Sequence, residues 1–131
     1  MMLFRKEENM EIQSKLLKLG NYGCYFLSLL HATKHTDSEI IELYDYFVKK
    51  GYMSEDCYIQ DPIKMLKYLT GNNYKVEKLE KLPAKYDFYV EHWYNEKTKL
   101  GHFTLPDFDP LGNSNTRLNG KIDSYRVFTK L

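Results

Sequence analysis

Residues 20–32 read GNYGCYFLSLLHA, and they place one cysteine, Cys24, between a turn of small and polar residues and an apolar run. After Cys24 the apolar side chains recur at helical spacing and cover nearly the whole circumference. This pattern is typical of a helix buried on most of its sides. We therefore expect a central helix that begins at Cys24, with the rest of the chain packed around it.

Further helices are expected on both sides of this segment, over residues 8–18, over residues 40–50 and from Pro62 onward. Gly20 is expected to end the first of them. Thr36–Glu39 has the capping-box pattern of a helix start. Asp61 and Pro62 are the residue types that favour the N-cap and the first helical position, and Gly71 supplies the stop. The first half of the chain is thus predicted to be helical.

The second half of the chain alternates apolar and polar residues with a period of two, which predicts strands. The segments are residues 74–79, 86–94, 100–105 and 121–131. The polar stretch 95–99 is expected to close a hairpin, and 109–116 is dense in turn-forming residues. Helices followed by an antiparallel sheet indicate an α+β fold. We expect one domain over residues 1–131, with its helical half at about 8–71 and its sheet half at about 74–131.

The composition excludes several classes of protein. A formal net charge of +1 gives no electrostatic footprint for nucleic acid or acidic lipid. The N-terminal stretch has no apolar core typical of a signal peptide, and no run is long enough to span a membrane, so a cytoplasmic protein is expected. Two cysteines are too few for a disulfide framework and lack zinc-ligand spacing, so neither metal nor cofactor is predicted.

Cys24 is the first candidate for chemistry. A helix N-terminus carries positive dipole character and free amide donors, which lower the pKa of a thiol and can hold an oxyanion. Gly23, which precedes it, leaves room for a substrate to approach the backbone. We therefore expect a nucleophilic thiol of lowered pKa, against the alternative of an inert buried cysteine.

His102 and a following acid complete the candidate constellation. His102 follows Gly101 at the start of a predicted strand, where its ring can face a packed helix. Asp107 and Asp109 lie within seven residues of it, and an acid that accepts the second ring proton fixes the imidazole tautomer. The prolines beside them break the strand alternation, so the spacing leaves both acids open. The other histidines and Cys57 are interpreted as packing or surface residues.

Three segments in this order, YGCYFLSLLHA, GHFTL and DPLGNSNTRLNGKIDSYRVF, resemble a small papain-like cysteine peptidase. The resemblance is closest to the bacteriocin-processing, double-glycine peptidases and their phage-borne relatives. It implies a papain-like fold, with the cysteine-bearing helix packed on a C-terminal antiparallel sheet. It also implies Cys24 as nucleophile, His102 as base and Asp109 of the Asp-Pro step as the orienting acid, with Asp107 as the runner-up. Asn21 is the candidate side-chain donor to the oxyanion.

Two functions follow as hypotheses. The first is a thiol hydrolase, a peptidase or amidase, that acts on a peptide or on a peptidoglycan-type amide. The second is a catalytically weak or inactive papain-like module that binds or regulates a protein partner. Neither hypothesis involves nucleic acid, a membrane or a cofactor.

Overall fold

The computed structural model describes residues 6–110, 112 and 115–131. Its helices are α1 (Lys6–Tyr22), α2 (Cys24–Ala32), the 3-10 helix η1 (Asp37–Glu39), α3 (Ile40–Lys50), α4 (Pro62–Thr70) and α5 (Asn115–Asn119). Its strands are β1 (Tyr74–Leu79), β2 (Phe88–Asn95), β3 (Leu100–Thr104) and β4 (Lys121–Lys130). The predicted order of helices first and strands afterwards is confirmed except for α5, which lies between β3 and β4.

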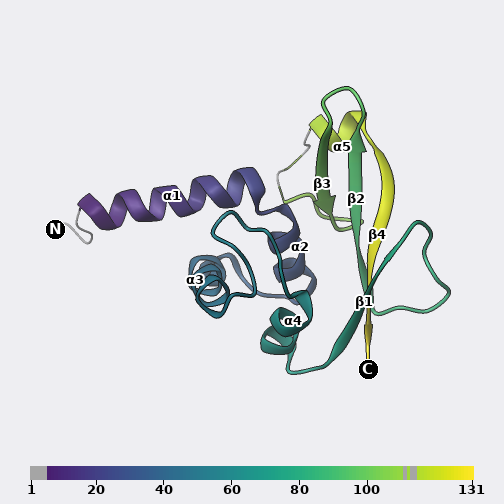
Figure 1. Cartoon of the computed structure of the whole chain (residues 1–131), viewed down its shortest axis with the longest axis horizontal. Helices are drawn as coiled ribbons and strands as arrows, with labels where there is room; N and C mark the ends of the chain where they lie inside the picture. The colour runs from purple at the N-terminus through teal and green to yellow at the C-terminus, as the bar shows by residue number, and fades with distance from the viewer. Residues whose placement is uncertain (1–5, 111, 113–114) are drawn as a thin grey trace.

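The described strands form one antiparallel sheet in the order β1-β4-β2-β3. The last strand of the chain therefore lies in the middle of the sheet, and β3, which carries His102, lies at an edge. Helices α2, α3 and α4 lie together on one side of this sheet, and α5 lies across the far end of β2 and β3 (Figure 1). The molecule has a mixed α+β fold with an antiparallel sheet.

Helix α2 occupies the centre of the molecule, as its apolar circumference predicts. Phe26, Leu29 and Leu30 are buried, and they belong to one hydrophobic core that also contains Val90 and Phe128 of the sheet. A helix that is buried between other helices and a sheet needs apolar side chains on most of its sides. Its position against β3 sets the place of its first residue, Cys24.

The junction between α1 and α2 differs from the prediction. Gly20 does not end the first helix, which continues to Tyr22 and breaks only at Gly23. Buried Leu19 anchors the last turns of α1 to the core. At Gly23 a side chain would clash, because an added Cβ would lie 2.5 Å from the carbonyl oxygen of Leu19. The missing side chain of Gly23 therefore serves the tight helix junction, and the predicted role in substrate approach has no support here.

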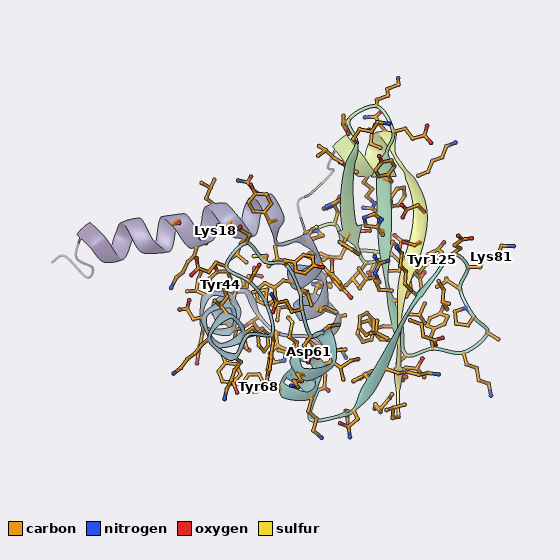
Figure 2. The ribbon with its side chains drawn as sticks, viewed as in Figure 1. Lys18, Tyr44, Asp61, Tyr68, Lys81 and Tyr125 are labelled. Atoms are coloured by element: carbon orange, nitrogen blue, oxygen red, sulfur yellow. The ribbon has the colours of Figure 1, made fainter. Side chains whose placement is uncertain are left out.

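Helix α1 extends away from the body of the molecule and is attached to it near its C-terminal end (Figure 1). Two ion pairs fasten this end, Lys15 with Asp45 at 2.7 Å and Lys18 with Glu55 at 3.5 Å. Lys18 and Tyr44 line one pocket together with Glu55, and Figure 2 shows the two labelled residues near each other. The Tyr44 hydroxyl donates a hydrogen bond to the Glu55 carbonyl oxygen. The loop that carries Glu55 is thus held by both α1 and α3.

The caps of α3 and α4 show how local sequence sets the helix ends. The Asp61 side chain accepts a hydrogen bond from the Lys64 N–H at 3.0 Å, and Pro62 occupies the first helical position. Gly71 ends α4 in the left-handed conformation, with φ +78°. The capping box at Thr36 is incomplete, because the Thr36 hydroxyl contacts the side chains of Ser38 and Glu39 and makes no cap hydrogen bond to the backbone.

Helix α5 was not expected, since residues 109–116 have the composition of a turn. It packs on β2 and β3 on the side away from α2, and Arg117 lies over the Trp93 ring at 5.8 Å. Across the described ranges, no helix combines the length and apolar character needed to cross a bilayer.

Candidate active site

His102 and Asp109 form a short, buried polar contact in the candidate site. The His102 Nε2 lies 2.6 Å from the Asp109 Oδ1, and the two side chains are only 4% and 3% exposed. The chain reverses after β3 through a bridge between Leu105 and Phe108, which returns Asp109 to the histidine. Asp107, the alternative acid, is exposed to solvent. Of the two candidate acids, Asp109 therefore contacts the imidazole.

The sulfur of Cys24 lies against the backbone of the residue that follows His102. The Phe103 N–H donates a hydrogen bond to the Cys24 Sγ at 3.4 Å. Because β3 is an edge strand, this N–H is not needed for the sheet and can face the N-terminus of α2. The Tyr25 ring stacks on the Phe103 ring at 4.4 Å and secures the contact between helix and strand. The sulfur thus lies beside β3 at the residue next to His102, and among the described residues no hydrogen bond joins Cys24 to the His102 ring itself.

The electrostatic environment of Cys24 differs from the prediction. Burial raises the pKa of the Cys24 thiol above its ordinary value of 9.0 and outweighs the backbone N–H groups of Phe103, Tyr25 and Cys24 itself, which lower it. The charge of Asp109 raises the pKa further. The expected lowering at the helix N-terminus is therefore wrong, and Cys24 is a protonated thiol at neutral pH.

A pocket of about 510 Å³ opens beside Cys24. Its lining includes side chains of α1, α2 and the sheet, among them Asn21, Cys24, Tyr25, His92, Phe103 and Arg126. Asn21 is exposed at the end of α1, so the predicted amide donor does line the same pocket as the sulfur. The volume of the pocket falls within the range of small-ligand pockets in proteins.

His92 lines this pocket, and sequence analysis assigned it no partner. Its Nδ1 lies 2.6 Å from the Asp123 Oδ1, so the molecule has a second imidazole–carboxylate pair. Asp123 reaches the ring because of a β-bulge. Ser124 pairs with His92 and Ile122 pairs with Trp93, which leaves Asp123 as an extra residue between them. No sequence signal reveals this pair, since it depends on the register of β4 against β2.

The remaining histidines and Cys57 have other roles. His31 is exposed and stacks on Phe108 at 3.9 Å between centroids. His35 contacts Glu39 at 2.7 Å and the Leu69 carbonyl oxygen at 3.0 Å. Cys57 belongs to the core, as expected, and burial raises its pKa to about 11. These three residues are accounted for by packing and loop structure.

Metal ligation has no basis among the residues that the structure describes, since no group of three or more His, Cys, Asp or Glu side chains is arranged to hold an ion. The chemistry available near Cys24 is therefore that of a thiol, an imidazole, carboxylates and backbone N–H groups.

Comparison with known proteins gives one result. No curated protein and no solved structure matches the chain significantly. Residues 2–130 match the family described as "Protein of unknown function, DUF261". Since the match covers almost the whole chain, the protein belongs to the DUF261 family.

Proposed function

We propose that the protein is a papain-like thiol hydrolase that cleaves amide bonds with Cys24, His102 and Asp109. The observation that carries the proposal is the buried contact of 2.6 Å between His102 and Asp109, in which the residue after His102 donates its backbone N–H to the Cys24 sulfur. An acid that holds one ring nitrogen leaves the other nitrogen, Nδ1, to act as a base. No hydrogen bond to this Nδ1 is formed within the described part of the chain.

The first half of the proposed reaction forms a thioester. His102 Nδ1 takes the thiol proton as the Cys24 Sγ bonds to the carbonyl carbon, and the carbonyl electron pair moves onto oxygen. The resulting imidazolium is stabilised by Asp109. The N–H groups at the start of α2, with Asn21 at the rim of the pocket, stabilise the oxyanion. The C–N bond then breaks, and the leaving amine takes the proton from His102.

The second half releases the acyl group. A water molecule gives its proton to His102 Nδ1 and attacks the thioester carbon. The C–S bond then breaks, the carboxylic acid leaves, and the proton returns from His102 to the sulfur. Because the resting thiol is protonated, the imidazole must act as a general base in the first step rather than as the partner of a preformed thiolate.

A second candidate is the papain-like module that binds a protein partner without turnover. The observation that favours it is the raised pKa of Cys24, since burial keeps the sulfur in its less nucleophilic form. The two candidates share one fold and one pocket, so a measurement of turnover separates them.

The test is hydrolysis of a complex peptide library, with new chain termini identified by mass spectrometry. We expect the wild-type protein to produce new termini and Cys24→Ala to produce none. His102→Ala and Asp109→Asn should slow cleavage by about 10²–10⁴-fold, the usual contribution of a positioned general base.

Asp107→Asn is the matched control for Asp109→Asn, because it makes the same chemical change at an exposed carboxylate outside the proposed machinery. It should retain activity within about twofold of wild type. Cleavage that survives Cys24→Ala would refute the mechanism. A wild-type protein that cleaves nothing in the library would favour the binding module.

A further inference from the structure

Arg126 of β4 is a cation without a carboxylate partner in the described part of the chain. Its Nη1 donates a hydrogen bond to the Ser124 Oγ at 3.0 Å, and its guanidinium lies 5.2 Å from the centre of the Phe103 ring. The side chain is half-buried, and it lines the pocket of Cys24. An arginine has five N–H donors in a planar fork, so most of them remain available to a ligand.

The surroundings of Arg126 orient the guanidinium without neutralising it. The Ser124 hydroxyl, which accepts from Arg126, donates to the Asp123 Oδ1 at 3.1 Å. That same oxygen is 2.6 Å from the His92 ring. The carboxylate of β4 is thus already engaged by a histidine and a serine, and Asp56, which also lines the pocket, forms no ion pair with Arg126 in the described structure. Arg126 can therefore pair with an incoming anion.

Phe103 connects Arg126 to the reactive sulfur. Its backbone N–H contacts the Cys24 Sγ at 3.4 Å, and its ring supports the guanidinium. Phe103 therefore contacts both the thiol and the cation, and Cys24 and Arg126 line the same pocket. A ligand in this pocket can thus present a carboxylate to Arg126 while its amide carbonyl lies at Cys24.

We infer that Arg126 is a specificity-determining residue that binds a carboxylate of the substrate. The preferred substrate class is then an acidic peptide or amide whose carboxylate lies next to the scissile bond. Two sources share this chemistry, the free C-terminus of a peptide and the side chain of Asp or Glu. The inference rests on the proposed function, because it selects the substrate of the Cys24 thiol.

Its test uses affinity alkylation, which requires no turnover. The rate of modification of Cys24 is measured with two pairs of reagents that differ only in one carboxylate. N-iodoacetyl-glycine and N-iodoacetyl-glycinamide represent a C-terminal carboxylate. N-iodoacetyl-glutamic acid α-amide and N-iodoacetyl-glutamine α-amide represent an acidic side chain.

We expect the wild-type protein to react about 10- to 100-fold faster with the carboxylate member of at least one pair, since this is the factor to which a charge-assisted hydrogen bond of about 1.5–3 kcal/mol corresponds. The pair that shows the preference identifies the source of the carboxylate. Arg126→Gln should abolish the preference, and Arg126→Lys, which retains the charge but loses the planar fork, should keep only part of it.

Lys130→Gln is the matched control, because it removes one positive charge from an exposed position of the same strand. It should leave the preference unchanged. The preference of the wild-type protein should also decrease as salt is added, which tests the charge interaction even if Arg126→Gln does not fold.

Equal rates within both pairs, or a preference that persists in Arg126→Gln, would overturn the inference. A preference that depends on Arg126 in a protein that cleaves no peptide would support the carboxylate subsite and refute the hydrolase. The two proposals can therefore fail separately.

Discussion

The Cys24 thiol determines how the reactivity of the site depends on pH. Its pKa is raised above 9.0 by burial, so the thiolate fraction is small at neutral pH and increases about tenfold per pH unit until the pKa is reached. We predict that alkylation of Cys24 by iodoacetamide accelerates in this way from pH 7 to pH 9. Cys57, with a pKa of about 11 and a buried side chain, should remain unmodified over the same range.

The measurement is the rate of modification of each cysteine, followed by mass spectrometry of peptides that contain it. A rate for Cys24 that is already constant at pH 7 would contradict the prediction, because it would mean that a preformed thiolate exists. His102→Ala should not change the slope of the profile, since burial rather than the imidazole sets the pKa.

Part of the candidate site could be predicted from sequence, because its residues are close along the chain or belong to a recognisable order. His102 and Asp109 are seven residues apart, and a short turn is enough to join them. His92 and Asp123 are 31 residues apart and meet only through a bulge in the sheet. The pKa of Cys24 also could not be predicted, since it depends on how deeply the helix start is buried.

The position of the break between α1 and α2 predicts that alanine substitutions at Gly20 and Gly23 change the stability of the protein in opposite directions. Gly23→Ala would force a Cβ to 2.5 Å from the Leu19 carbonyl oxygen, and we expect it to destabilise the protein by about 1–3 kcal/mol. Gly20→Ala meets no atom within 4 Å inside a regular helix, and it should stabilise the protein by about 0.5–1 kcal/mol. Urea denaturation of the two variants measures both signs.

The opposite signs separate the role of the two glycines, so each variant is the control of the other. Destabilisation of similar size by both substitutions would show that the turn lies at Gly20, as the sequence pattern predicts, and would contradict the structure.

Helix and strand boundaries were predictable wherever local chemistry sets them. Asp61, Pro62 and Gly71 enclose α4 as expected, because caps depend on neighbouring residues only. The end of α1 was predicted too early, since a single glycine does not end a helix that tertiary packing at Leu19 supports. Helix α5 was missed because its residues favour turns. The packing of α5 on β2 and β3 overrides this local preference.

The helices and the sheet share a single hydrophobic cluster, which predicts that they unfold together. Phe26 is fully buried in this cluster, and Phe26→Ala should cost about 3–5 kcal/mol. Trp93, the sole tryptophan of the chain, reports on the sheet by fluorescence, and far-UV circular dichroism reports on the helices. We predict coincident transitions by the two signals in urea, both shifted to lower concentration in Phe26→Ala.

Tyr58→Ala, at a side chain that is 72% exposed, is the control and should move neither transition by more than about 0.5 kcal/mol. Two separate transitions in the wild-type protein would contradict a shared core and would show that the helical half and the sheet half are independent units.

Asp123 is an extra residue in β4, and it interrupts the regular pairing of β4 with β2 while it supplies the carboxylate that contacts His92. A strand one residue shorter at this point would pair without interruption along β2, and it would lose the carboxylate that engages His92. Regular pairing and the acid–imidazole contact thus favour different spacings between Ile122 and Ser124. Among relatives of this chain, a deletion at this one position would mark the lineages that have lost the His92–Asp123 pair and gained an uninterrupted pairing of β4 with β2.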